Sequence, residues 1–102
     1  MAKFKTIRDL DLAAKRVNKA DGSEVHLTPT EWRVVEILVR NKDKLVSQRQ
    51  LLQEAWGPQY ETESEYLRTY LAAIRRKLEP EPSTPRYFLT EPRMGYRFVD
   101  GR

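Results

Sequence analysis

The segment TESEYLRTYLAAIRRKLEP, residues 62–80, decides the fold of this chain. Its large apolar residues recur at intervals of three and four, and these are Leu67, Leu71, Ile74 and Leu78. This spacing places them on one face of an α-helix. Thr62 and Glu65 have the spacing of an N-terminal capping box, and Pro80 cannot continue a helix. The sequence therefore predicts an amphipathic helix that packs against a core and ends before Pro80.

The opposite face of this helix combines small residues with arginines. At about 100° per residue, it carries Glu65, Arg68, Thr69, Ala72, Ala73 and Arg76, with Arg75 at its flank. Small side chains let a helix backbone approach another surface closely, and the planar guanidinium of arginine can bind guanine edges or phosphates. The alternative is an ordinary solvent-exposed face made of good helix formers. We favour contact with DNA for this face.

Three acidic residues, Glu61, Glu63 and Glu65, stand at the start of the same helix. Carboxylates stabilise a helix N-terminus through its dipole, but they repel phosphate groups. We therefore expect this end of the helix to lie away from the DNA backbone or to contact a protein.

Two further helices are predicted earlier in the chain from their capping residues. Thr28-Pro29-Thr30-Glu31 supplies an N-cap threonine, a proline at the first helical position and a glutamate at the third. Ser47-Gln48-Arg49-Gln50 repeats the capping pattern, with serine as the N-cap and glutamine three residues later, and Gly57 and Pro58 end the second helix. The apolar residues fall on one side of each helix: Trp32, Val35, Leu38 and Val39 in the first, and Leu51, Leu52, Ala55 and Trp56 in the second.

Short strands are predicted on both sides of the helices. Apolar residues alternate with polar ones in residues 1–27, as in half-buried strands, and these are Leu10, Leu12, Val17, Val25 and Leu27. Residues 87–90 and 96–99 flank a turn and predict a hairpin. The order of elements predicts an α+β fold of the winged helix-turn-helix type, with a single domain over residues 1–102. Its parts are an N-terminal antiparallel sheet in 1–27, a three-helix bundle in 28–80 and a β-hairpin wing in 86–100.

Length and composition favour a basic domain without catalytic machinery. The 102 residues carry a formal net charge of +4 and a pI near 9.5, which favours a polyanionic partner. There is no cysteine, the only histidine is His26, and the four glycines do not form a phosphate-binding loop. We expect no enzymatic activity, no metal and no cofactor. The lack of a long apolar segment predicts a cytoplasmic chain without a membrane partner.

The predicted hairpin and the end of the second helix hold the remaining candidate residues. Strand alternation places Tyr96 and Arg97 on opposite faces, and for Arg97 we favour pairing with a carboxylate. Arg93, at the turn, is expected to contact a minor groove, where the negative potential is enhanced. Trp56 either packs in the core or donates its indole N–H to a phosphate.

Several motifs, taken together, resemble the effector domain of the OmpR/PhoB class of two-component response regulators. The resemblance covers nearly the whole chain. It is carried by Leu27-Thr28-Pro29, Glu31-Trp32, Ser47-Gln48-Arg49, Leu51-Leu52, Trp56-Gly57, Ile74-Arg75, Lys77-Leu78-Glu79 and Gly95-Tyr96-Arg97-Phe98. A finer resemblance, in residues 56–58, 66–68 and 85–91, is to a member of the class that regulates potassium-transport genes.

The resemblance implies an N-terminal four-stranded sheet, a third helix in the DNA major groove and a wing in the neighbouring minor groove. Thr69 and Ala73 match positions that face bases. Positions that commonly meet the DNA backbone are matched by Trp56, Tyr66, Tyr70, Ala72 and Arg75. Because Ala72 and Ala73 stand where relatives often carry arginines, we expect base contacts from Arg68 or Arg76. Arg93 replaces the first glycine of the usual wing motif Gly-x-Gly-Tyr-Arg-Phe, so the wing arginine lies one residue later than in relatives.

The resemblance also implies partners beyond promoter DNA. The loop between Pro58 and Ser64 corresponds to the segment that contacts RNA polymerase in the family, and the family often binds DNA as a tandem homodimer. A receiver domain with a phosphorylatable aspartate does not fit into residues 1–27, so we expect this chain to be an effector fragment of a longer regulator. The alternative function is a winged-helix module that binds proteins and not DNA.

Overall fold

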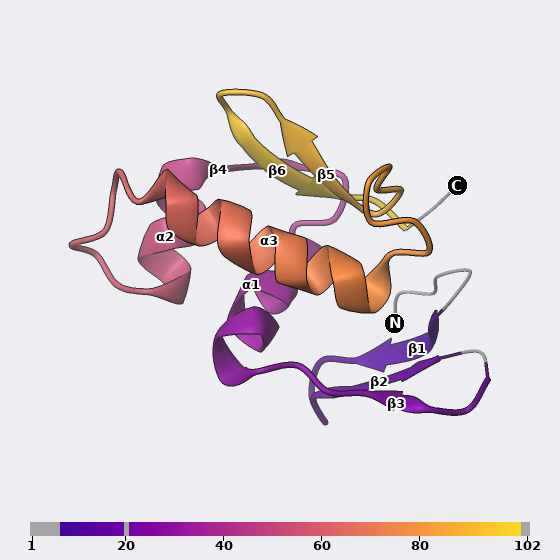
Figure 1. The fold of residues 1–102 in the computed structure, drawn as a ribbon. Helices are drawn as coiled ribbons and strands as arrows, with labels where there is room; N and C mark the ends of the chain where they lie inside the picture. The colour runs from indigo at the N-terminus through magenta and orange to yellow at the C-terminus, as the bar shows by residue number, and fades with distance from the viewer. Residues whose placement is uncertain (1–6, 20, 101–102) are drawn as a thin grey trace.

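The computed structural model describes residues 7–19 and 21–100, which form three helices between two small antiparallel sheets (Figure 1). The elements, in chain order, are β1 (Ile7–Asp11), β2 (Arg16–Lys19), β3 (Glu24–Val25), α1 (Pro29–Arg40), β4 (Leu45–Ser47), α2 (Gln48–Ala55), α3 (Ser64–Leu78), β5 (Phe88–Glu91) and β6 (Gly95–Phe98). The predicted α+β winged helix-turn-helix architecture is confirmed.

The first sheet has the strand order β1-β2-β3. Val17 of β2 is paired with Leu10 of β1 and with Val25 of β3, and all three side chains are buried. The alternation read from residues 1–27 therefore identified the inward face of this sheet. A four-stranded sheet was expected from the resemblance; the described residues contribute three strands to it, and residues 1–6 lie outside the described part of the chain.

The first two helices begin where their capping residues predict. At α1, the Thr28 hydroxyl accepts a hydrogen bond from the Glu31 backbone N–H at 3.2 Å, and the Glu31 carboxylate accepts one from the Thr28 N–H at 2.9 Å. At α2, the Ser47 hydroxyl accepts from the Gln50 N–H at 3.0 Å. Each bond satisfies a backbone donor that has no partner within the helix.

The start of α3 differs from the prediction, because Thr62 and Glu65 do not form a capping box. The N-cap is Glu63, without a side-chain capping bond, and the helix begins at Ser64. The Glu63 carboxylate instead accepts hydrogen bonds from the backbone N–H groups of Glu61 and Thr62, at 3.0 and 3.1 Å. A local turn closed by this carboxylate therefore replaces the threonine cap, since short-range side-chain bonds compete with capping geometry.

The second sheet has the order β4-β6-β5, so the C-terminal hairpin is joined by a strand that the sequence did not predict. In β4, Val46 is paired with Tyr96 and Ser47 with Gly95. Gly95 has a φ of +154°, and a Cβ there would stand 2.0 Å from the Val46 carbonyl oxygen. Only glycine allows this close approach of the two backbones. The hairpin wing is thus anchored directly before the start of α2.

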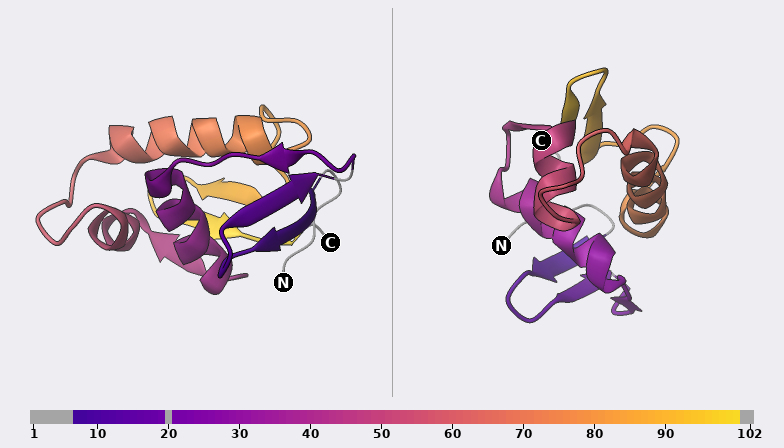
Figure 2. Two further views of the ribbon diagram at one scale, coloured as in Figure 1. Left: turned by 90° about the horizontal axis from the view of Figure 1, so that it is seen from below. Right: turned by 90° about the vertical axis from the view of Figure 1, so that its left-hand side faces the viewer.

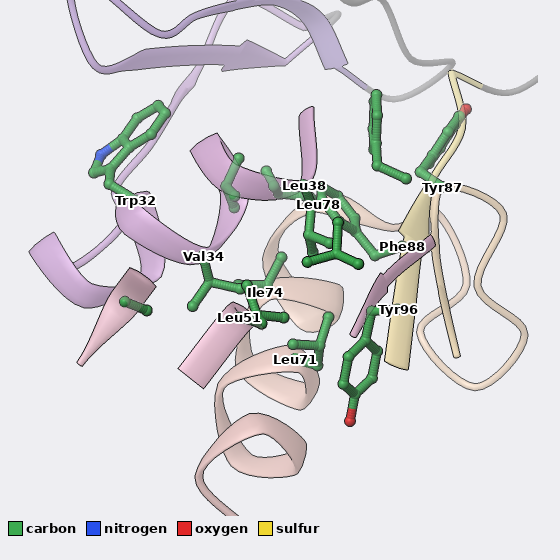
Figure 3. Close-up of a cluster of buried hydrophobic side chains, with 14 of the residues drawn as sticks. Trp32, Val34, Leu38, Leu51, Leu71, Ile74, Leu78, Tyr87, Phe88 and Tyr96 are labelled. Atoms are coloured by element: carbon green, nitrogen blue, oxygen red, sulfur yellow. The ribbon is translucent and has the colours of Figure 1, made fainter. Parts of the chain in front are cut away.

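The core lies between the helices and the two sheets. All four apolar residues singled out in α3 are fully buried: Leu67, Leu71, Ile74 and Leu78. They contact a cluster that includes Leu38 of α1, Leu51 of α2 and Phe88 of β5 (Figure 3). Burying each such side chain contributes roughly 1.5–3 kcal/mol. The apolar face of α3 therefore holds the helix in place and leaves its other face outward.

The chain after α3 is held by a buried carboxylate. Glu79, the C-cap of the helix, accepts hydrogen bonds from the backbone N–H groups of Arg86, Tyr87 and Phe88 at 2.7–2.9 Å. Its side chain is buried, and the ring of Tyr87 is buried beside it. The bonds fix the end of α3 to the start of β5, which sets where the wing begins relative to the helix.

Candidate nucleic-acid interface

The outer face of α3 is uncovered by the rest of the described chain. Figure 2 shows the helix along one side of the molecule, with the wing and the N-terminal sheet on opposite sides of the three helices. Arg68, Thr69, Ala72 and Arg76 are exposed, and Ala73 is partly exposed. The face predicted for contact is therefore accessible along most of the helix, with two alanines at its centre and an arginine on each side.

The two exposed arginines differ in their surroundings. Arg68 forms an ion pair with Glu65, one turn earlier, at 3.0 Å between its Nη1 and a carboxylate oxygen. The guanidinium of Arg76 has no ion pair or hydrogen-bond partner within residues 7–19 and 21–100. Both can reach a polyanion, because an exposed ion pair of the Arg68 kind is worth only about 0.2–1 kcal/mol.

Arg75, predicted to meet the DNA backbone, is tied to the wing. Its Nε and Nη2 donate to the Phe88 carbonyl oxygen at 2.9 and 2.7 Å, and Nη2 also donates to the Thr90 hydroxyl at 2.8 Å. Burial lowers the pKa of Arg75, and the nearby Tyr96 and Glu79 act in the opposite direction. The structure thus gives this guanidinium an intramolecular role that the helical pattern could not show: it joins α3 to β5.

Tyr96 lies mainly inside the molecule. Its side chain is 6% exposed, and its ring lies beside Leu71 with the hydroxyl pointing away from the apolar cluster (Figure 3). Burial raises the pKa of the phenol, while the positive charges of Arg75 and Arg68 lower it. The hydroxyl therefore stands in the positive field of two α3 arginines, and the ring serves the core. As a predicted DNA contact, Tyr96 can offer little more than this hydroxyl.

Four aromatic rings cluster where α2 meets the start of α3. The ring centroids of Trp56 and Tyr70 are 5.2 Å apart in an edge-on arrangement. The ring centroid of Tyr66 lies 5.7 Å from that of Trp56 and 5.9 Å from that of Tyr60. Trp56 is partly buried against the core, whereas Tyr66 is 43% exposed. Trp56 therefore packs against the core, and part of its side chain stays accessible to a partner. Tyr60 was missed, because it lies in a loop and shares no periodic pattern with the helix.

The loop between α2 and α3 is held against α2 by an ion pair and a hydrogen bond. Arg49 pairs with Glu61 at 3.3 Å, and the Gln53 side-chain amide donates to the Pro58 carbonyl at 3.2 Å. Glu61 and the neighbouring Glu63 carboxylate are therefore committed to local structure. Of the three acidic residues at this end of α3, only Glu65 has its carboxylate on the outer face of the helix.

The tip of the wing is a tight turn with an arginine in a left-handed conformation. The Met94 N–H donates to the Glu91 carbonyl at 3.0 Å, and Arg93 has a φ of +66°. Proline at the second position of the turn and a positive φ at the third are typical of a type II turn, which favours glycine there. Arg93 and Met94 are both exposed. The predicted wing arginine thus projects from a turn whose backbone it strains.

Arg97 is paired inside the wing, as predicted. Its Nε donates to the Glu91 carboxylate at 2.9 Å and its Nη1 to the Asp43 carbonyl at 2.8 Å. Tyr96 and Phe98, on the other face of the strand, are buried. Arg97 therefore stabilises the sheet and is not offered to a partner.

Neither a metal centre nor a membrane span is found in the part of the chain that the structure describes. Residues 7–19 and 21–100 contain no group of three histidine, cysteine, aspartate or glutamate side chains placed to hold a metal ion. Among the same residues, every helix is too short or too polar to cross a bilayer.

An outward helix with a β-hairpin wing fixed to its C-terminal half defines a winged helix-turn-helix domain. The chain belongs to the family of C-terminal domains of OmpR/PhoB-type transcriptional regulatory proteins, whose model, described as "Transcriptional regulatory protein, C terminal", matches residues 22–98. The resemblance drawn from the sequence motifs is thereby confirmed.

Two curated relatives carry the likeness further. The chain is 62% identical over 89 residues to the transcriptional regulatory protein KdpE of Mycobacterium tuberculosis, covering 87% of this chain and 39% of that protein. It is 44% identical over 99 residues to the KDP operon transcriptional regulatory protein KdpE of Escherichia coli, covering 97% and 43%. The chain thus spans about two-fifths of the length of these relatives.

Solved structures match the fold over nearly the whole chain. The DNA-binding domain of Klebsiella pneumoniae RstA, determined in complex with the RstA box, superposes with a TM-score of 0.81 at 19% identity and covers 96% of this chain and 95% of that one. The DNA-binding domain of Escherichia coli CpxR gives 0.78 at 23% identity, with 98% and 96% covered. At these identities the likeness concerns the fold.

Proposed function

We propose that this chain binds double-stranded promoter DNA sequence-specifically, as the effector domain of a two-component response regulator. The observation that carries the proposal is the outer face of α3. It presents Arg68 and Arg76 around Thr69, Ala72 and Ala73, with no other described element over it. An α-helix of this kind fits the major groove of B-DNA, where side chains meet base edges.

The residues differ in what they would contact. Arg68 and Arg76 would read base edges, and Thr69, Ala72 and Ala73 would permit close approach of the helix. Phosphates would be met by the polar ends of the aromatic residues, which are Trp56, Tyr66, Tyr70 and Tyr96. Arg93 would enter the minor groove beside the wing. Arg75 would act mainly by holding the wing on α3, because its Nε and Nη2 already donate to Phe88 and Thr90.

The salt dependence of binding tests this proposal. Each phosphate neutralised by a basic side chain releases counterions, so the logarithm of the affinity falls with the logarithm of salt concentration by about 0.9 per contact. Fluorescence anisotropy with a random duplex should show micromolar binding at low salt and a steep loss towards physiological salt. An affinity that is unchanged over this range would contradict binding to the DNA backbone.

We infer a target among potassium-transport genes from the two relatives named KdpE, one of which is named for the KDP operon. Because those proteins are longer, control through a receiver domain is part of the same proposal. Contact of the loop between Pro58 and Ser64 with RNA polymerase, binding as a tandem homodimer and a cytoplasmic location also belong to it. Footprinting on the promoter of a potassium-transport operon would test the target.

A second candidate function is a winged helix that binds a protein and not DNA. The start of α3 favours it, because the exposed Tyr66 there stands near the acidic residues Glu61, Glu63 and Glu65. The same anisotropy titration separates the two functions. If the chain does not bind random duplex DNA at micromolar protein concentration and low salt, the result would support the protein-binding function.

A further inference from the structure

Glu65 is out of place on a surface that is proposed to meet a polyanion. At about 100° per residue, Thr69, Ala72 and Arg76 lie within about 40° of Glu65 around the axis of α3. Its side chain is 77% exposed. Around the helix axis the carboxylate therefore lies on the midline of the outer face and not at its margin, in the first turn of α3.

Stability does not account for this carboxylate. Its ion pair with Arg68 is between two largely exposed groups, at 77% and 69%, and such pairs stabilise a fold very little. The helix N-terminus already has another acidic side chain in Glu63, the N-cap residue. A neutral residue at position 65 would cost the fold little, so the effect of the charge is to be sought in binding.

The geometry connects the carboxylate to the arginine expected to read bases. Glu65 and Arg68 are one turn apart, with the Arg68 Nη1 3.0 Å from a Glu65 oxygen. An unpaired arginine in this place would bind whichever phosphate came near, on any sequence. Paired with Glu65, its guanidinium has little net charge left to attract a phosphate, whereas the paired O6 and N7 acceptors of guanine are neutral and are not repelled by the carboxylate.

We propose that Glu65 is a specificity-determining positioning residue, which acts through Arg68 to weaken binding to non-cognate DNA. The carboxylate repels phosphates that approach the helix and keeps the Arg68 guanidinium from them. The selected sequence supplies a base acceptor that compensates for the lost ion pair. This inference rests on the proposed DNA binding of the same face.

The test compares Glu65→Gln with wild type on two probes. One is a random duplex, and the other is the duplex that the wild-type chain enriches from a randomised pool. We expect Glu65→Gln to bind the random duplex about fivefold more tightly, the factor expected from removing one carboxylate–phosphate repulsion in water. The salt slope on the random duplex should steepen by about 0.9, because Arg68 then takes a phosphate. The ratio of the affinity for the selected duplex to the affinity for the random duplex should fall.

Two controls isolate the mechanism. Glu24→Gln makes the same charge change in β3, in the N-terminal sheet away from the wing, and should leave the affinity ratio unchanged (Figure 1). In an Arg68→Ala background, Glu65→Gln should tighten binding to the random duplex by a clearly smaller factor than it does with Arg68 present, because no guanidinium is released to take a phosphate. Circular dichroism of each variant checks that the helices are retained.

The outcomes separate this inference from the function on which it rests. If wild type binds neither duplex, the proposed DNA binding fails. If wild type binds with a preference but Glu65→Gln behaves like Glu24→Gln, the role of Glu65 is refuted and DNA binding stands. If the effect of Glu65→Gln is just as large without Arg68, the carboxylate acts on DNA only directly and the positioning role is refuted.

Discussion

Arg75 of α3 donates two hydrogen bonds to the main-chain carbonyl of Phe88 in β5, through Nε at 2.9 Å and Nη2 at 2.7 Å. A third bond, to the Thr90 hydroxyl, extends the contact along the same strand. The helix proposed to enter the major groove and the wing proposed to enter the minor groove are therefore joined by one side chain. Their relative position, and not only their separate surfaces, is built into the fold.

Loss of Arg75 should therefore weaken both the fold and DNA binding without changing sequence preference. We expect Arg75→Ala to lower the free energy of unfolding by about 1.5–3 kcal/mol, the range for a hydrogen-bonded charged group. Urea unfolding measures this loss. Affinity for random and selected duplexes should fall by the same factor, and a loss confined to the selected duplex would show that Arg75 reads bases. Arg75→Lys should restore only part, because an ammonium lacks the planar fork.

Arg68 and Arg76 should behave differently from Arg75. Replacing either with alanine should cost about 1–3 kcal/mol on the selected duplex if it makes a bidentate base contact, with a smaller effect on random DNA. Competition titrations with single-base variants of the selected duplex would locate the position at which preference is relaxed. Equal losses on specific and random DNA for both variants would contradict this division.

Glu79 should be among the residues most sensitive to substitution outside the apolar core. Its carboxylate accepts from the N–H groups of Arg86, Tyr87 and Phe88, the last two of which are buried. Glu79→Ala should lower the free energy of unfolding by about 3 kcal/mol or more, since each unsatisfied buried donor costs about 1–3 kcal/mol. Glu79→Gln keeps one acceptor oxygen, so its free energy of unfolding should lie between those of wild type and Glu79→Ala. Denaturant unfolding of the two variants measures their free energies of unfolding. If Glu79→Ala unfolds with the same free energy as wild type, the Glu79 carboxylate does not stabilise the fold.

Arg93 should show a conflict between stability and binding. Its φ of +66° costs a non-glycine residue about 1–2 kcal/mol, so Arg93→Gly should raise the free energy of unfolding by about 1 kcal/mol. The same variant should bind DNA more weakly. Arg93→Ala is the matched control, because it removes the guanidinium but keeps the strained backbone. If it binds as wild type does, the wing arginine is not a DNA contact.

Because Tyr96 is buried as a neutral phenol, we expect the free energy of unfolding to fall at alkaline pH. Burial raises the pKa of Tyr96 in the folded chain above its ordinary value of 10.0. Its contribution is therefore complete below this value and is lost as the pH rises from there through the higher pKa of the folded state. The stability difference between wild type and Tyr96→Phe should be constant near neutral pH and should shift against wild type above about pH 10. A constant difference through that range would contradict the burial argument.

Local sequence signals were sufficient for the starts of α1 and α2 and for the buried face of α3. Thr28, Glu31 and Ser47 act on backbone groups three residues away, so their capping bonds follow from spacing alone. The buried face of α3 could be predicted for the same reason, because helical periodicity relates residues three and four apart. These contacts need no information about distant parts of the chain.

Signals failed where one local bond competed with another or where the partner was remote. Thr62 was expected to cap α3, but the Glu63 carboxylate accepts hydrogen bonds from the backbone N–H groups of Glu61 and Thr62 instead. The three residues of β4 are too few to show alternation, and they became a strand only by pairing with β6. Spacing cannot tell which of two such bonds forms.

By itself, the sequence determined which face of α3 is apolar and which carries arginines, because both follow from the helical repeat. Only the tertiary structure decided what each arginine does. Arg75 meets a strand thirteen positions later, Arg68 is held by Glu65, and Arg76 stays unpaired within the described residues. The physical reason is that charge and periodicity are properties of the chain, whereas the acceptors that occupy a guanidinium are brought to it by folding.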